Sequence, residues 1–309
     1  MTNINTSPRK PLLALALSIM LPGLGQVYNG QLNRGVFIFL AFVFITLPFI
    51  TFVALILPPV WLFPLLVLSL IATLGLYAYS IWDAWRVARQ LSDFNPYPWQ
   101  QPAVYVALLL FAYLSVIGSA TQYVRGHLVE AFRIPSDSMS PNVLRGDYLF
   151  ADKRVNCPGC KRQIKHGDIA IFVYPNNRTR LYIKRIIGLP GDEIKIQSHE
   201  VFVNGKSLKA ATTQLSSSKL NDDEKYLYER GNAVDYPVLW DETIDAVDFT
   251  MTVPSGQVFV LGDNRDKTTD SRKFGTVPLM DVVGLARQVW FSYSPDTGVR
   301  WKRLGMVLK

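Results

Sequence analysis

The sequence predicts an N-terminal α-helical transmembrane region followed by an all-β domain, and three observations support this fold class. Hydrophobic residues make up 49% of the 309 residues and charged residues only 18%, which is unusual for a soluble protein. No charged residue occurs at positions 35–82, whereas from residue 125 onward short apolar runs are bounded by Gly, Pro, Asn and Asp. We therefore expect a membrane anchor over residues 1–124 and a β-rich domain over residues 125–309.

The uncharged stretches are long enough for about three transmembrane helices. One crossing takes about 20 apolar residues, so the first stretch predicts spans at 35–57 and 60–82, separated by a Pro-Pro pair. A second uncharged stretch, at 99–124, predicts a third span at 102–122.

Residues 11–30 fit a span less well. Their apolar part is about half a span long and gives way to Pro-Gly-Leu-Gly-Gln-Val-Tyr-Asn-Gly, so we expect a re-entrant or interfacial segment. The basic pair Arg9 and Lys10 before an apolar run is also typical of a cleavable secretory signal. Because further spans follow and no small-x-small site is present, we expect no cleavage.

Basic residues in short loops predict the orientation, since such loops stay cytoplasmic. They flank the expected helices at Arg9, Lys10, Arg34, Arg86 and Arg89, which places the β domain outside the cytoplasm. The net charge of +8 lies largely in these loops and near the C-terminus, and it suits an anionic lipid surface. We find no nucleic-acid-binding motif.

The β domain is expected to contain several short strands, because β-branched residues alternate with polar ones between turn signals. Asn204 and Gly205 tolerate positive φ and predict a hairpin turn. The polar stretch 206–250 is interpreted as a variable insertion, a solvated loop with a small satellite core. The strands are expected at 147–151, 168–174, 181–187, 193–196, 201–203, 257–261 and 283–292.

Cys157 and Cys160 are the two cysteines of the chain. A zinc site would need two more ligands, and the three histidines show no metal-ligand spacing to this pair. A thioredoxin-like role would need a βαβ setting. We therefore predict a local disulfide in an oxidising compartment, with no metal and no cofactor.

Two segments offer a serine nucleophile and a lysine base. The first is Ile-Pro-Ser-Asp-Ser-Met-Ser-Pro at 134–141, directly after the last apolar run, and from chemistry alone Ser136, Ser138 and Ser140 are all candidates. The second is Leu-Tyr-Ile-Lys-Arg-Ile-Ile at 181–187. A lysine acts as a base only when neutral, so Lys184 must be buried to lower its pKa.

Arginine stays protonated and cannot be a base. Arg185 is therefore expected to pair with a carboxylate such as Asp270.

Four blocks in order carry a resemblance to the bacterial type I signal peptidases. They are Phe-Arg-Ile-Pro-Ser-Asp-Ser-Met-Ser-Pro at 132–141, His-Gly-Asp-Ile-Ala-Ile-Phe at 166–172, Tyr-Ile-Lys-Arg-Ile-Ile-Gly-Leu-Pro-Gly-Asp at 182–192, and Gly-Asp-Asn-Arg-Asp-Lys-Thr-Thr-Asp-Ser-Arg-Lys-Phe-Gly at 262–275. This chain differs from the usual pattern at Asp137, Asn142 and Thr268, and none of these changes removes a reactive group.

The resemblance implies a role for each site residue. It makes Ser138 the nucleophile and Lys184 the general base, with Ser136 donating its hydroxyl to the oxyanion beside the Ser138 backbone N–H. The supporting residues are Asp270 with Arg272, which hold the site together, Thr268, which bonds the lysine amine, and Arg185. The substrate pocket would be lined by Phe132, Ile134 and Ile183.

The implied function is endoproteolytic removal of N-terminal signal peptides after an Ala-x-Ala-like site, on the outer side of the bacterial inner membrane. The expected partners are preprotein signal peptides and the lipid bilayer, with no nucleic acid and no obligate protein partner.

Two alternatives stay open. One is a specialised Ser-Lys peptidase for a single substrate, such as a conjugation or pilin-maturation peptidase. The other is a non-catalytic membrane assembly factor that works through residues 21–30. A self-cleaving repressor would carry a DNA-binding helix-turn-helix in place of the apolar N-terminus.

Overall fold

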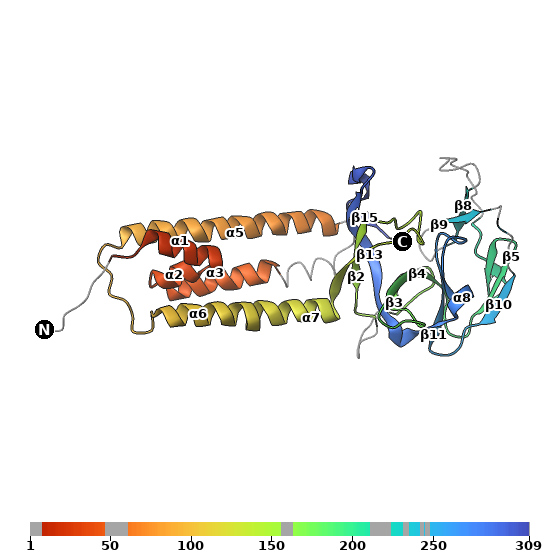
Figure 1. Cartoon of the computed structure of the whole chain (residues 1–309), viewed down its shortest axis with the longest axis horizontal. Coiled ribbons are helices and arrows are strands. Elements are labelled where there is room, and N and C mark those ends of the chain that lie inside the picture. Colours follow the sequence, from red (N-terminus) through yellow and green to blue (C-terminus); the bar gives the residue numbers. More distant parts are fainter. Residues whose placement is uncertain are drawn as a thin grey trace. The chain divides into compact units, whose positions relative to one another are not determined.

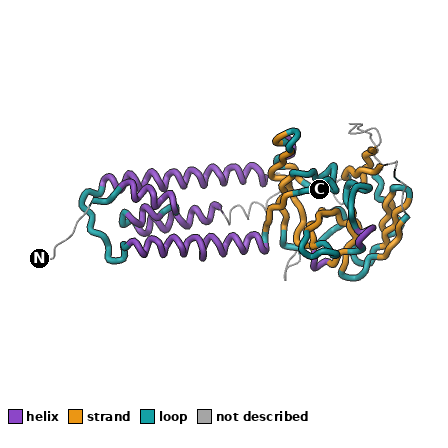
Figure 2. Tube along the Cα trace, viewed as in Figure 1, coloured by secondary structure: helices purple, strands orange, loops and turns teal. Residues whose placement is uncertain are grey.

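The computed structural model describes residues 8–46, 61–155, 163–210, 224–230, 235–241, 244 and 248–308. The chain divides into two compact units, Met1–Gly126 and His127–Lys309. Figure 1 shows helices in the first unit and a β-rich second unit, and Figure 2 shows the same division by secondary structure. The predicted fold class is therefore confirmed. Cys157 and Cys160 lie outside the described residues.

The described part of the helical unit has short helices near the N-terminus, then the long helix α5 and the consecutive helical elements α6, η3 and α7. The bounds are α1 Pro11–Met20, α2 Leu24–Tyr28, α3 Leu32–Phe44, α5 Leu62–Gln90, α6 Pro102–Leu110, the π-helical segment η3 Phe111–Gly118, and α7 Ser119–His127. The helices α1 and α6 each have proline in the first turn, where no backbone N–H is needed.

Two described helices are long and apolar enough to cross a membrane: Pro64–Gln90 and Pro102–His127. Both continue past their expected ends, at 82 and 122. The expected span at 35–57 begins within α3, which ends at Phe44, and its second half, with the Pro-Pro pair, lies outside the described residues.

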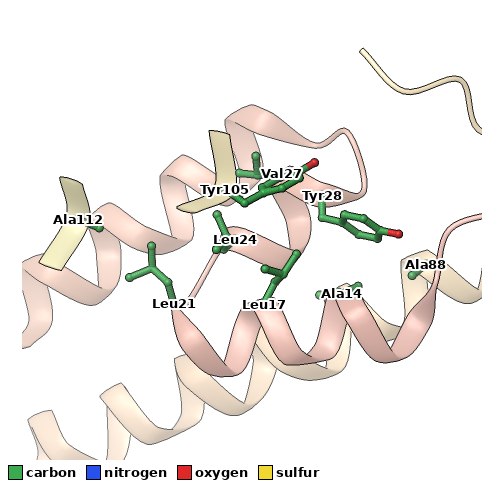
Figure 3. Packing of buried hydrophobic residues seen from close by; sticks show 10 residues of the cluster. Ala14, Leu17, Leu21, Leu24, Val27, Tyr28, Ala88, Tyr105 and Ala112 are labelled. Carbon is green, nitrogen blue, oxygen red and sulfur yellow. The ribbon is translucent and has the colours of Figure 1, made fainter. Parts of the chain in front are cut away.

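The glycine-rich segment forms a tight helical corner at α2. The helix α1 has 10 residues and rises only about 15 Å, so it is too short to span a membrane. Figure 3 shows its buried side chains Ala14 and Leu17 near Leu24 of α2. A Cβ on Gly25 would lie 2.3 Å from the Ala14 carbonyl oxygen, so only glycine permits this approach.

Buried side-chain amides form hydrogen bonds between the same segment and α5. The Gln26 amide donates to the Ser80 carbonyl oxygen at 2.8 Å and to the Asp83 carboxylate at 3.0 Å. The Asn29 amide donates to the Ala84 carbonyl oxygen at 2.7 Å, and Arg34 forms an ion pair with Asp83. The glycine-rich segment, part of the expected re-entrant or interfacial stretch 11–30, thus packs against α1 and α5.

The β unit is built around one large antiparallel sheet. Its strand order is β1-β2-β13-β3-β4-β11-β12, with β14 and β15 also pairing with β13, and a smaller sheet has the order β10-β5-β6-β7. The strands are β1 Val129–Arg133, β2 Asp147–Asp152, β3 Ile169–Val173, β4 Leu181–Gly188, β5 Glu193–Gln197, β6 Glu200–Val203, β7 Lys206–Ser207, β8 Glu224–Glu229, β9 Tyr236–Asp241, β10 Phe249–Thr252, β11 Gln257–Leu261, β12 Val277–Pro278, β13 Val282–Ser294, β14 Gly298–Val299 and β15 Met306–Val307.

Each expected strand is present with small differences at its ends. The expected turn is also present, because Asn204 and Gly205 have φ of 52° and 74° and Val203 pairs with Lys206 across it. Within the expected insertion 206–250, β8 and β9 form a hairpin. The buried Tyr236 and Trp240 of β9 join a core with the small sheet that also includes Phe259 and Leu261 of β11 in the large sheet.

The strand that carries the lysine is central in the large sheet. Between β3 and β11, β4 is buried at every position from Ile183 to Gly188. Its Ile183 packs with Ile134 and Met139 of the serine-bearing segment in one core cluster. This packing brings the two segments together.

Candidate active site

The serine segment leaves β1 as a turn that is anchored at both ends. The Ile134 backbone N–H donates to the Asp147 carbonyl oxygen, and the Gly146 N–H donates back to Ile134. Within the turn Met139 is fully buried, while Ser138 is half-exposed. Burial of the methionine beside it thus holds the Ser138 hydroxyl at the surface of a cleft.

The candidate base, Lys184, lies within hydrogen-bonding distance of this serine. Its Nζ is 2.8 Å from Ser138 Oγ and 2.9 Å from the Ile183 carbonyl oxygen, and the residue is only 3% exposed. Burial lowers the pKa of Lys184 from 10.5 to about 8, although the carboxylates of Asp270 and Asp263 raise it. A substantial fraction of the amine is therefore neutral just above neutral pH, as general-base chemistry requires.

A cleft of about 500 Å³ exposes these groups, and its lining includes Ser136, Ser138, Ile183, Lys184 and Thr268. The Ser136 hydroxyl lies 3.4 Å from the Ser138 hydroxyl, on the same side of the turn. This position suits a donor to an oxyanion that develops beside Ser138.

A loop rich in charged residues, at 262–275, lines part of the cleft. Asp270 caps the short helix α8 Ser271–Phe274 and binds the Arg272 guanidinium with both oxygens, at 2.9 and 2.8 Å. It also accepts from the Gly262 backbone N–H. The predicted Asp270–Arg272 pair is present.

Arg185 has a different partner from the one expected. It forms a fully buried, two-point ion pair with Asp263, at 2.8 and 2.7 Å, and stacks on the Tyr236 ring at 3.8 Å. Asp270 is occupied by Arg272 instead. The reason is that β4 and β11 pair antiparallel, which sets Arg185 opposite Leu261, two residues before Asp263.

Thr268 also differs from expectation, because its hydroxyl does not bond the lysine amine. Thr268 Oγ1 is buried and has no hydrogen-bond partner among the described residues. It packs against Gly262, where a Cβ would lie 2.5 Å from it. The amine bonds the Ile183 carbonyl oxygen and Ser138 Oγ instead, and Thr268 lines the cleft while its hydroxyl oxygen stays buried.

The three predicted pocket residues are placed differently from one another. Ile183 lines the catalytic cleft, whereas Ile134 lines a second cleft of about 1010 Å³ on the other face of the turn. Phe132 is half-buried and packs against the core that contains Ile134 and Ile183. The structure therefore brings only Ile183 to the cleft beside Ser138.

Several residues that support the site were missed by sequence reasoning. Asp263 and Arg265 are fully buried and Asn264 nearly so, and the three are consecutive in the block at 262–275. That density of charged residues was visible in the sequence, but their partners were not. Among the described residues, no group of three or more His, Cys, Asp or Glu is placed to hold a metal ion.

A serine hydroxyl beside a buried lysine amine is an arrangement suited to acyl transfer. The chain belongs to the signal peptidase family, peptidase S26, whose model matches residues 104–291.

Individual relatives carry the name signal peptidase I. One, from Buchnera aphidicola, is 29% identical over 242 residues, which cover 60% of this chain and 76% of the relative. Another, from Pseudomonas fluorescens, is 32% identical over 192 residues, which cover 55% and 67%. A crystal structure of a signal peptidase I from Enterococcus faecalis is 30% identical, covers 40% of this chain and 97% of that one, and superposes with a TM-score of 0.28.

Proposed function

We propose that this chain is a signal peptidase I that removes N-terminal signal peptides from exported preproteins, with Ser138 as nucleophile and Lys184 as general base. The observation that carries the proposal is the 2.8 Å contact between Ser138 Oγ and Lys184 Nζ. It is supported by burial of the amine, which lowers its pKa to about 8. Membership of the family and the names of the relatives support the substrate class.

The proposed reaction proceeds through an acyl-enzyme. Neutral Lys184 accepts the Ser138 proton as Oγ attacks the scissile carbonyl carbon. The oxyanion that forms accepts hydrogen bonds from the Ser138 backbone N–H and the Ser136 hydroxyl. When the C–N bond breaks, the lysine ammonium gives its proton to the leaving amine. Lys184 then takes a proton from a water molecule as its oxygen attacks the ester carbonyl carbon. The lysine ammonium returns that proton to Ser138 Oγ when the ester C–O bond breaks.

The proposed specificity is for small side chains at the first and third positions before the cleaved bond, the Ala-x-Ala pattern. Ile183 lines the cleft beside the nucleophile, where a branched apolar side chain favours a small partner. Phe132 and Ile134 stay proposed members of the pocket. Their test is substitution of each by alanine, which should relax the selection against larger residues.

The proposed location is the bacterial inner membrane, crossed several times, with the β unit on the periplasmic side. Two described helices are apolar and long enough to span, and basic residues cluster before α1 and at the end of α5. A reporter fused after Arg89 should be found inside the cell and one fused after Ala120 outside. An external Arg89 fusion would overturn this orientation.

The decisive experiment uses the full-length protein purified in detergent and a preprotein with an Ala-x-Ala site. We expect a single cut, located by N-terminal sequencing directly after the second alanine. A matched preprotein with phenylalanine at both alanine positions should stay intact. An intact Ala-x-Ala preprotein, or equal cleavage by Ser138→Ala, would overturn the proposal.

A further inference from the structure

The hairpin of β8 and β9 belongs to the stretch to which sequence reasoning assigns no chemistry, yet β9 lies directly against the catalytic loop. The Leu239 N–H donates to the Asp263 carbonyl oxygen at 2.8 Å, and the Arg265 N–H donates to Leu239 at 2.9 Å. The Asp241 N–H donates to the Asp266 carboxylate at 2.7 Å. The loop thus uses β9 as its backbone partner.

A buried ion pair joins the hairpin to the same loop. Glu229, the last residue of β8, is 4% exposed and accepts from both terminal nitrogens of the Arg265 guanidinium, which is fully buried. The Tyr236 hydroxyl donates to Glu229 at 3.1 Å. Burial raises the pKa of Tyr236, and the Glu229 charge adds to this effect, so the phenol stays a donor.

The Arg265 side chain also forms a hydrogen bond with the backbone of the loop. Its Nε donates to the Gly262 carbonyl oxygen at 3.0 Å. A Cβ on Gly262 would lie 2.6 Å from the Ser138 carbonyl oxygen, so the loop and the nucleophile turn are in close contact. A shift of Gly262 would therefore displace Ser138.

Two asparagines make direct hydrogen bonds between the loop and the turn. Asn264 donates its backbone N–H to the Ser138 carbonyl oxygen at 3.2 Å and its amide to the Asp137 carbonyl oxygen at 3.3 Å. Asn142, in the turn, donates its amide to Asp263 and to the Pro237 carbonyl oxygen of β9, each at 2.7 Å. The nucleophile turn is thus tied to both the loop and the hairpin.

We propose that Glu229 is a positioning residue for the nucleophile: through Arg265 and the loop at 262–266, it fixes where Ser138 stands relative to Lys184. This inference rests on the proposed role of Ser138. Loss of the Glu229 charge leaves a buried guanidinium without its counter-charge, and the loop must move to rehydrate it. A displacement of about 1 Å at a reacting atom can lower the rate about 10²-fold.

The test compares Glu229→Gln with a matched variant elsewhere, Asp152→Asn. Asp152 is likewise a buried carboxylate in ion pairs with arginine, Arg154 at 3.0 Å and Arg287 at 3.5 Å, but it lies in β2, outside the proposed machinery. We measure kcat and KM for preprotein cleavage, per folded molecule, well below each melting temperature. Glu229→Gln should lower kcat about tenfold or more with KM changed less than about threefold. Asp152→Asn should lower the melting temperature only.

The pH profile separates positioning of the nucleophile from tuning of the base. The charges that act on the pKa of Lys184 are those of Asp270 and Asp263, so Glu229→Gln should keep the wild-type midpoint. Should Glu229→Gln fail to fold, Tyr236→Phe removes one hydrogen bond to Glu229 and should give a smaller loss of kcat.

An unchanged kcat per folded molecule in Glu229→Gln, or in Tyr236→Phe where the first variant does not fold, would overturn the inference. An equal loss of kcat in Asp152→Asn would also overturn it. Activity in Ser138→Ala would instead overturn the proposed function itself, so the two failures are distinguishable.

Discussion

Two segments of this chain combine closely packed glycines with buried polar side chains, and these side chains have different roles. At 21–30, in the helical unit, Gln26 and Asn29 donate mainly to backbone carbonyl oxygens of α5, and Gly25 allows helices to touch. At 262–275, in the β unit, Asp263 and Asp270 bind arginines around Lys184. The first segment fastens helices, whereas the second surrounds a group that can lose a proton.

The comparison teaches that buried polar density alone does not identify a site. Each segment has a buried side-chain oxygen with no hydrogen-bond partner among the described residues, at Asn29 in the first and at Thr268 in the second. What distinguishes the second region is a titratable amine whose pKa burial has lowered, next to a nucleophile and open to a cleft. Mutations in the first segment should therefore lower stability, whereas mutations around Lys184 should lower the rate of cleavage.

The largest expected effect is loss of cleavage in Ser138→Ala and Lys184→Ala, each by more than about 10³-fold, with the double variant no worse because the two act as a unit. Lys184→Arg should be equally inactive, since a guanidinium stays charged. Lys153→Ala is the control, because this lysine of the same domain pairs with Glu130 away from the cleft. Turnover by Lys184→Arg would refute the assignment of Lys184 as the general base.

Next in size is Ser136→Ala, whose hydroxyl lies 3.4 Å from that of Ser138. If it donates to the oxyanion, kcat should fall about 10²–10³-fold with little change in KM. Ser136→Thr keeps a donor and should retain much of the activity. A lowered melting temperature with normal kcat would show that Ser136 is only structural.

A smaller effect is expected for Asp270→Asn. The Asp270 charge raises the pKa of Lys184, so its removal should lower that pKa and move the midpoint of the pH–rate profile to lower pH. The Arg272 charge left unpaired acts in the same direction. An upward shift of the midpoint, measured on kcat/KM, would contradict this electrostatic account.

The smallest effect on rate is expected in the helical unit. Gln26→Leu removes three hydrogen bonds to α5 and should destabilise this unit by about 0.6–1.7 kcal/mol per bond, measured by thermal melting in detergent. The kcat for a soluble peptide substrate should stay at the wild-type value. A fall in kcat with unchanged melting would show that residues 21–30 take part in the reaction.

The strands were predictable from local sequence, because alternation and turn residues are local signals. The choice of Ser138 among three nearby serines came from the resemblance. The side of the sheet toward which Lys184 points was not predictable, since β4 is buried on both sides from Ile183 onward and shows no alternation there. The lysine could therefore be assigned only by resemblance.

Contacts between distant segments could not be predicted. Arg185 and Asp263 are 78 residues apart, and Glu229 and Arg265 are 36 apart. Several acids in the block at 262–275 have the right charge to pair with Arg185, and only the strand register decides which one is in reach. The lack of a hydrogen-bond partner for the Thr268 hydroxyl among the described residues likewise follows from its close packing against Gly262, which the sequence does not show.

The pH dependence of kcat/KM for the wild-type enzyme tests the central claim most directly. Protonated Lys184 cannot accept the Ser138 proton, and burial sets its pKa at about 8. Activity should therefore rise as pH increases, reach half of its plateau near pH 8 and be lost as pH falls below that value. A profile that is flat across this range, or that falls as pH rises, would contradict a neutral lysine as the base.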